Sequence, residues 1–162
     1  MSMEQPPVSI VLEKLGVPHR VFHHENPVHS FEQAASERGQ RPGQVVRSLL
    51  FRVQDGEYAM VLAAGPAQIS WKLLRKILGR SRISMASEDE VLQVTGYRVG
   101  TVGPFGLLNQ VRMFIDAGVM REDEVSIGSG MRNTAVILKS NDLHHALKDS
   151  EIVELFEKNS AD

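Results

Sequence analysis

The spacing of apolar positions changes several times along the chain, and each change predicts a new element of secondary structure. The first predicted element is a helix that begins at Pro7 and runs to about Leu15. Proline suits the first turn of a helix, and Gly16 is a natural place for the helix to stop. An extended segment from Arg20 to His24 is expected next, so the chain opens with a helix followed by a strand.

Serine residues predict where three further helices begin. Ser30 is followed by Gln33 and Ser87 by Glu90, which is the spacing of a capping box. In this motif the side chain of each of the two residues accepts a hydrogen bond from the main-chain N–H of the other. Ser70 precedes a third run with helical spacing. The helix after Ser30 is expected to end at Gly39, the one after Ser70 near Gly79 and the one after Ser87 near Gly96.

Alternating or continuous apolar runs predict the strands. The runs Val45–Val53 and Tyr58–Ala64 flank an Asp55-Gly56 pair, which is typical of a β-hairpin. Shorter strands are expected at Arg82–Met85, Val111–Ile115, Glu124–Ile127 and Thr134–Leu138. The last element, from about Asn141 through Phe156, is expected to be helical with a break near Asp149.

The irregular order of helices and strands, with a hairpin among them, predicts an α+β (mixed α/β) fold: a mixed sheet flanked by helices. A regular doubly wound array would alternate strands and helices more evenly. The 162 residues contain no repeat and no linker long enough to separate two cores. We therefore expect a single domain over residues 1–162, with its core at about 7–157.

The charge balance excludes a general attraction to nucleic acid. The chain has 18 basic and 20 acidic residues, a formal net charge of −2, so contact with a polyanion must use a local patch. The absence of cysteine excludes a disulfide framework, a thiolate zinc site and a cysteine nucleophile. No stretch is apolar enough to span a membrane and the first residues do not resemble a signal peptide, so we expect a cytoplasmic protein with no membrane or DNA partner.

One such local patch lies between Trp71 and Arg82, a stretch with five basic residues and no acidic one. Lys72, Arg75 and Lys76 fall close to one face of the predicted helix, away from its apolar face. The two interpretations are a surface that binds nucleic-acid phosphates and an ordinary solvated face.

Glycine gathers in two predicted loops. The segment from Gly96 to Gly106 has four glycines and one proline in eleven positions, and the segment from Gly128 to Thr134 lies between two predicted strands. Glycine allows a main chain to approach a ligand closely and to turn its N–H groups outward, so these loops are candidates for binding a carbonyl or an oxyanion. The alternative is that both are ordinary tight turns.

A group of histidines suggests a metal site but does not have the spacing of one. His23 and His24 would point to opposite faces of a strand, and no HExxH pattern accompanies them. We therefore expect no metal and no cofactor. His29 stands at a predicted helix start, where it could face a cleft or serve as a surface residue.

Several segments together resemble the aminoacyl-tRNA deacylase family typified by YbaK and the editing domain of bacterial prolyl-tRNA synthetase. Gln44–Phe51 is similar to the family's strand that carries a lysine, and Thr95–Gly106 is similar to its hallmark loop, with Gly100 and Pro104 matching its GxxxP motif. Phe114–Asp116 and Gly128–Thr134 resemble the family's later strand and closing loop. The matches follow the family's order from about residue 9 to residue 147.

The resemblance implies a curved mixed sheet with an aminoacyl pocket between the two glycine loops. It also implies metal-independent hydrolysis of the ester that joins a wrong amino acid to tRNA, with mischarged tRNA as partner and an aminoacyl-tRNA synthetase as a second candidate partner. The catalytic positions implied are Arg47, Gly100, Gly103, Pro104 and Gly106. The substrate-binding positions implied are His29, Ser30, Phe105, Gly128, Gly130, Asn133 and Thr134. If the basic helical face binds nucleic acid, Lys72, Arg75 and Lys76 are the expected tRNA-binding positions.

The sequence departs from the family at Arg47, where the family has lysine. A guanidinium group is planar with a fixed set of donors, whereas an ammonium group is compact. The substitution leaves two hypotheses open: a trans-editing deacylase, or a non-catalytic member that binds aminoacyl-tRNA, nucleotide or a protein partner.

Overall fold

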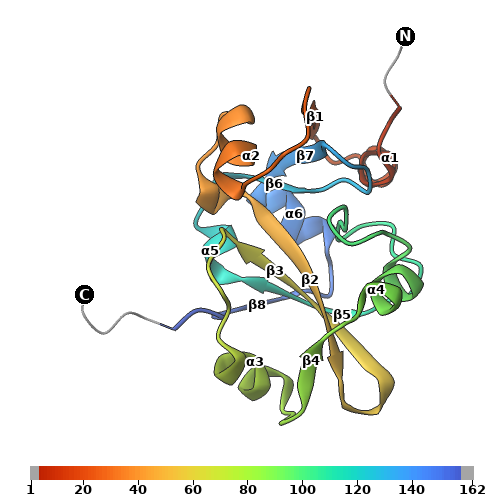
Figure 1. The fold of residues 1–162 in the computed structure, drawn as a ribbon, viewed down its shortest axis with the longest axis vertical. Coiled ribbons are helices and arrows are strands. Elements are labelled where there is room, and N and C mark those ends of the chain that lie inside the picture. Colours follow the sequence, from red (N-terminus) through yellow and green to blue (C-terminus); the bar gives the residue numbers. More distant parts are fainter. Residues whose placement is uncertain (1–3, 158–162) are drawn as a thin grey trace.

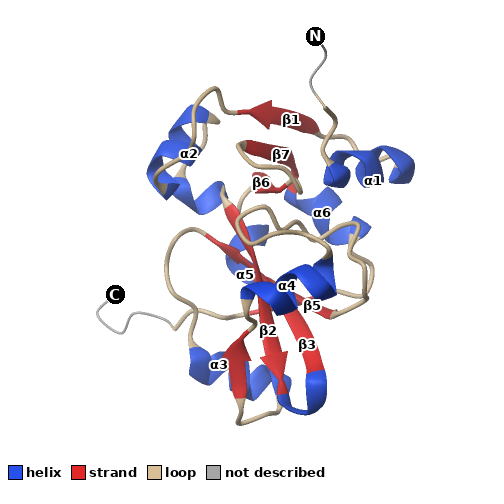
Figure 2. Ribbon diagram, turned by 45° about the vertical axis from the view of Figure 1, so that its right-hand side comes forward, coloured by secondary structure: helices blue, strands red, loops and turns tan. Residues whose placement is uncertain are grey.

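The structure, a computed structural model that describes residues 4–157, contains two β-sheets with helices around them (Figures 1 and 2). The helices are α1 Pro7–Leu15, α2 Phe31–Glu37, α3 Trp71–Leu78, α4 Glu88–Thr95, α5 Ala117–Met120 and α6 Ser140–Ala146. The strands are β1 Arg20–His23, β2 Val46–Val53, β3 Glu57–Ala64, β4 Ile83–Met85, β5 Arg112–Asp116, β6 Glu124–Gly128, β7 Thr134–Lys139 and β8 Glu151–Val153.

The strands divide into a three-stranded sheet in the order β1-β7-β6 and a five-stranded sheet in the order β4-β2-β3-β5-β8. The smaller sheet is antiparallel, and the larger is mixed because β5 and β8 run parallel to their neighbours. A parallel bridge between Val45 and Ser126 joins the start of β2 to β6. The predicted mixed fold flanked by helices is confirmed, with its strands distributed over two sheets.

Strand β2 is paired along its whole length on one side only. The hairpin with β3 runs from Val46 opposite Ala64 to Val53 opposite Glu57, but β4 pairs only with the last three residues of β2. At the end of that pairing Ala86 N donates to Leu50 O over 3.0 Å. Main-chain groups of alternate residues point to the same edge of a strand, so those of Ser48 point to an edge that β4 leaves open.

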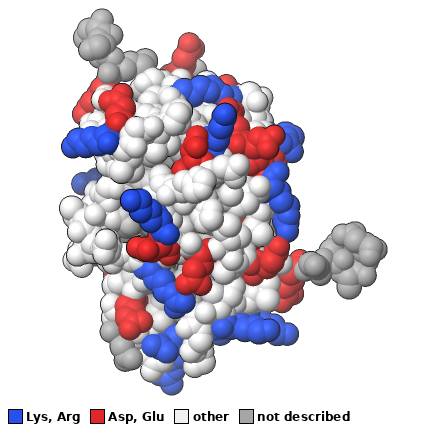
Figure 3. All heavy atoms as spheres, turned by 180° about the vertical axis from the view of Figure 1, so that it is seen from behind, with Lys and Arg blue, Asp and Glu red and all other residues white. Residues whose placement is uncertain are grey.

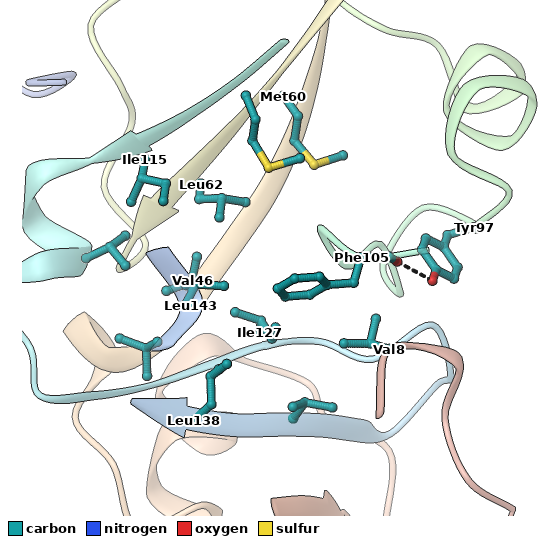
Figure 4. Packing of buried hydrophobic residues seen from close by; sticks show 14 of the residues in the cluster. Val8, Val46, Met60, Leu62, Tyr97, Phe105, Ile115, Ile127, Leu138 and Leu143 are labelled. Atoms are coloured by element: carbon teal, nitrogen blue, oxygen red, sulfur yellow. Dashed lines mark hydrogen bonds between the residues drawn. The ribbon is translucent and has the colours of Figure 1, made fainter. Parts of the chain in front are cut away.

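Two apolar clusters cover the two faces of the larger sheet. The cluster between the sheets includes Val46, Leu62, Ile127 and Leu138, and Figure 4 shows their side chains converging from both sides. The second cluster lies under α3 and includes Phe51, Leu74 and Phe114. Since neighbouring side chains of β2 point to opposite faces, Val46 and Leu50 join the first cluster and Phe51 and Val53 the second.

The predicted helix signals are confirmed where the side chains can be compared. Ser30, Ser70 and Ser87 each accept a hydrogen bond from a main-chain N–H of the first turn. The capping box at Ser87 is complete, whereas the Gln33 side chain accepts from His29 N instead of Ser30 N. The glycines at the ends of α1, α3 and α4 have the left-handed conformation that a helix end favours.

The prediction for the C-terminal part is wrong beyond Ala146. Helix α6 ends there, and Glu151–Val153 form strand β8, which pairs with β5 at the edge of the larger sheet. A three-residue strand is too short to show a period of two, so its apolar residues looked like the continuation of a helix. The four-residue helix α5, capped by Asp116, was not predicted either. Within residues 4–157 no helix is both long and apolar enough to cross a membrane.

Candidate active site

A cavity of about 620 Å³ runs along the open edge of β2. Consecutive residues from Val45 to Leu50 line it, which happens when a cavity faces the edge of a strand instead of one face. The other walls come from α2, the start of α4, the loop at residues 99–102 and the adjoining ends of β6 and β7. Its volume lies within the range of roughly 300–1,000 Å³ that is typical of small-molecule sites.

The two predicted glycine loops meet main chain against main chain. A Cβ added to Gly128 would lie 1.9 Å from Val102 O, and one added to Gly103 would lie 2.3 Å from Gly128 O. A real side chain cannot come this close, so both positions require glycine. Gly130 N also donates to Thr101 O over 2.8 Å. The loops therefore form one continuous wall of the cavity.

Gly100 has a different role in this wall. It lines the cavity, its φ is +92°, and a Cβ added to it would meet nothing within 4 Å. Space is therefore available at Gly100, and it is the left-handed backbone that favours glycine here. Gly100 is exposed and lines the cavity, and a main-chain N–H at such a position can bind a carbonyl oxygen.

The rest of the hallmark loop supports this wall from behind. Phe105 is buried in the cluster between the sheets, and Gly103 and Pro104 are buried beside it. Tyr97 Oη donates to Phe105 O over 2.6 Å, the bond drawn in Figure 4, and burial raises the pKa of the Tyr97 phenol. Gly106 has a φ of +75° and does not line the cavity. The structure thus brings only Gly100 of the four predicted loop positions to the cavity, and it places Phe105 in the core.

The second loop also contributes only part of its predicted set. Gly128 and Thr134 line the cavity, whereas Gly130 and Asn133 do not. Asn133 is exposed with a φ of +56°, a turn conformation that asparagine tolerates. Its role is to turn the chain into β7.

The N-terminal end of α2 borders the cavity. His29 and Ser30 both line it and both are exposed. The Ser30 hydroxyl caps the helix by accepting from Gln33 N over 3.0 Å.

Arg47 lines the cavity from the open part of β2 and is half-buried. Its Nη2 donates to Ala67 O in the loop that follows β3, while its Nε is buried without a hydrogen-bond partner in the described residues. Burial lowers the pKa of this guanidinium, because the charge loses hydration, although an arginine stays protonated. Val46 packs in the cluster between the sheets, so the two neighbours point to opposite faces of β2.

The basic face of α3 lies apart from the cavity. Lys72, Arg75 and Lys76 are exposed, and none of the three lines the cavity. Arg75 instead borders a second hollow of about 440 Å³, together with Arg52 and Arg82. Figure 3 shows blue and red side chains interspersed over the face that it presents.

The histidines do not form a metal centre in the described residues, where no three His, Asp or Glu side chains gather closely enough to hold an ion. His24 is buried: its Nδ1 lies 2.7 Å from Glu37 Oε1, and Arg38 Nε donates to its Nε2 over 3.1 Å. Sequence reasoning missed Arg38, which lines the cavity. An arginine at a helix end looks like an ordinary surface residue, and nothing nearby in the sequence indicates its distant partner.

The fold and the cavity define a mixed α/β domain with a site at the edge of its larger sheet, built from an arginine-bearing strand and two glycine loops. Residues 25–146 match the profile of the aminoacyl-tRNA editing domain family. The chain belongs to this family.

Similar proteins agree with this assignment. YwhH of Bacillus subtilis is 33% identical over 129 residues, covering 75% of this chain and 82% of the relative. Proline–tRNA ligase of Thermosipho melanesiensis is 30% identical over 110 residues, which cover 68% of this chain and 19% of the ligase. The chain therefore spans about a fifth of that enzyme.

A solved structure described as a proposed trans-editing enzyme for prolyl-tRNA synthetase has the same fold. It superposes with a TM-score of 0.85 at 24% identity, covering 93% of this chain and 95% of that one.

Proposed function

We propose that this protein is a trans-editing deacylase that hydrolyses the ester between a wrongly attached amino acid and its tRNA. The observation that carries the proposal is the 620 Å³ cavity with Gly100 in its wall. Membership of the editing family and the proline–tRNA ligase relatives support the same substrate class.

The reaction requires an electrophile to be positioned and an oxyanion to be stabilised. Water adds to the ester carbonyl carbon, the carbonyl oxygen takes up the negative charge, and the C–O bond to the ribose then breaks. The nucleophile's proton ends on the leaving ribose oxygen, with the neighbouring ribose hydroxyl as the relay. We assign stabilisation of the oxyanion to a main-chain N–H in the wall at Gly100, and one such donor is worth roughly 10²–10³ in rate.

This chemistry needs no strong nucleophile from the protein, because an aminoacyl ester is already activated and positioning alone lowers its barrier. Two closely packed main chains form the loop wall at Gly103 and Gly128, so the wall is rigid. A rigid wall suits a site that holds a carbonyl in one orientation.

Arg47 lines the cavity, and its charge suits the phosphate or ribose of a terminal adenosine. Its Nη2 bond to Ala67 O restrains the side chain, and the Nη hydrogens that this bond does not use can meet a phosphate or ribose oxygen. We assign Arg47 to binding the tRNA end, and the exposed basic face of α3 to the phosphates of the acceptor stem.

A second candidate function is binding of aminoacyl-tRNA without hydrolysis. The observation that favours it is Arg47 itself, since a fixed guanidinium fork in place of the family's lysine changes both the reach and the geometry of the charge.

The test is to incubate the purified protein with a panel of mischarged and correctly charged tRNAs and to follow loss of the ester. Faster loss from at least one mischarged tRNA supports the deacylase. Tight tRNA binding with no ester loss from any member of the panel would establish the binding function instead.

A further inference from the structure

Arg38 is a charged residue in the cavity wall that the proposed reaction does not yet use. Helix α2 presents Phe31 and Ala34 to the cavity, and Arg38 follows with the same helical spacing just past the end of α2. The wall along α2 is therefore apolar near its start and cationic at its end.

Two hydrogen bonds hold the Arg38 guanidinium in place. Its Nε donates to His24 Nε2 over 3.1 Å, and its Nη1 donates to Ser126 Oγ over 2.9 Å. Because His24 Nε2 accepts, the proton of the ring is on Nδ1, where it faces Glu37 Oε1 at 2.7 Å. The histidine and Ser126 are both buried, so this support is rigid.

The arrangement leaves Nη2 of Arg38 with no hydrogen bond among residues 4–157, although Arg38 lines the cavity. Within the same residues no carboxylate forms an ion pair with it, and the Glu37 carboxylate bonds His24 and Gln33 instead. Arg38 is half-buried; burial lowers the pKa of its guanidinium, and the Glu37 carboxylate nearby raises it. A half-buried cation that forms no ion pair among these residues and keeps a free donor favours an anionic ligand.

Arg38 also stands at a defined distance from the ester-binding wall. Its partner Ser126 and the wall residue Gly128 are two positions apart on β6, which corresponds to about 7 Å along a strand. A group bound at the loop wall can therefore extend a short chain toward Arg38.

The geometry points to Arg38 as a specificity-determining residue that binds an anionic oxygen of the substrate. This inference rests on the proposed function, in which two parts of the substrate can supply that oxygen: the side chain of the aminoacyl group, or the phosphate of the terminal nucleotide. His24 and Ser126 are positioning residues that act through Arg38.

The test uses four non-hydrolysable adenosine analogues with an amide at the 3′ position. They carry alanine or aspartate, each with and without a 5′-phosphate, and their affinities are measured by calorimetry at low salt. A charge-assisted hydrogen bond predicts that the anionic group that reaches Arg38 tightens binding to the wild-type protein by roughly 10- to 100-fold. The analogue that shows this preference identifies the source of the oxygen.

The variant Arg38→Met keeps the apolar stem of the side chain and removes the charge, so the preference should fall to less than about threefold. Arg38→Lys keeps the charge without the fork and should retain part of it. Arg41→Met is the matched control, because Arg41 is exposed, pairs with Glu122 and does not line the cavity. A purely structural role of Arg38 would change the stability or all four affinities together and leave their ratio unchanged.

An unchanged ratio in folded Arg38→Met and Arg38→Lys would overturn the inference, and so would a wild-type protein that binds none of the four analogues or shows no preference. Deacylation of mischarged tRNA is measured in parallel. Wild-type hydrolysis with an unchanged ratio would reject only the role of Arg38, whereas an Arg38-dependent ratio without hydrolysis would reject only the deacylase.

Discussion

The two halves of strand β2 have the same neighbour on one side and different surroundings on the other. From Val46 to Leu49 the second edge is open and borders the 620 Å³ cavity, whereas from Leu50 to Val53 the edge is bonded to Ala86 and to β4. The second half instead borders the basic hollow of about 440 Å³. Where β2 is paired on one side only, its main-chain groups are available to a small ligand. Where it is paired on both sides, only its side chains are available.

We expect these two surroundings to divide the work between them. The open half and its glycine wall should determine the rate of ester hydrolysis, and the paired half with α3 should determine how tightly the tRNA backbone is held. Changes near the open half should therefore act on the single-turnover rate, and changes near the paired half on affinity.

The largest effect is expected at Gly100. In Gly100→Ala the new Cβ meets open space, but a φ of +92° is strained for alanine, so the N–H should move. Single-turnover deacylation should fall by roughly 10²–10³. Gly16→Ala is the matched control, since Gly16 also has a positive φ and open space but ends α1. Both variants should lose about 1 kcal/mol of unfolding free energy, measured by urea titration. Equal activities would count against the role of Gly100.

A smaller effect is expected at Arg47. Arg47→Ala removes one charged interaction, so kcat/KM should fall by roughly 10- to 100-fold. Arg47→Lys should recover part of the loss if charge placement matters most, and little if the fork is essential. Circular dichroism verifies the fold, and Arg20→Ala on β1 is the control, since Arg20 is exposed and outside the cavity. A folded Arg47→Ala protein with wild-type activity would remove this residue from the site.

Charge reversal on α3 should act on binding and spare the rate at saturation. The triple variant Lys72→Glu, Arg75→Glu and Lys76→Glu should raise the Kd for tRNA. It should also reduce the slope of log K against log salt by about one for each tRNA phosphate that the variant no longer binds. Reversal of Lys14, Lys139 and Lys148, three exposed lysines outside the cavity and the hollow, changes the net charge equally and serves as the control. If both triple variants lose affinity to the same extent, the effect comes from net charge alone.

The smallest effect concerns the link between the hairpin and α4. Tyr58 Oη donates a hydrogen bond to the Glu90 carboxylate. The pKa of Glu90 is lowered, first by its hydrogen bond with the Ser87 main chain and then by the one from Tyr58. A carboxyl whose pKa is lower in the folded than in the unfolded state stabilises the fold at a pH above its unfolded-state pKa. This stability is lost as the pH falls through the folded-state pKa. Glu90→Gln should therefore flatten the decline of stability in acid, as measured by thermal melts from neutral to acidic pH. An identical decline in both proteins would show that the pair adds nothing.

Much of the fold could be predicted because its signals are local. The caps at Ser70 and Ser87, and the glycines that end α1, α3 and α4, depend on neighbours within a few residues. Strand β8 could not be predicted, because its pairing with β5 is a contact between distant segments that leaves no period in three residues.

The candidate site shows the same division between local and distant signals. Gly100 stands out because glycine-rich loops are visible in a sequence, and it does line the cavity. Phe105 belongs to the same loop but is buried in the core, since the direction of a loop side chain depends on the packing around it. Arg38 was not predicted because its partner Ser126 lies 88 positions away.

The most direct test of the account is single-turnover ester loss from a panel of mischarged tRNAs, with wild type, Gly100→Ala and Gly16→Ala compared side by side. The account predicts that wild type and Gly16→Ala remove the amino acid from at least one mischarged tRNA well above the spontaneous rate. Gly100→Ala should be slower by roughly 10²–10³ on the same substrate. A wild-type protein that binds these tRNAs and leaves every ester intact would contradict it.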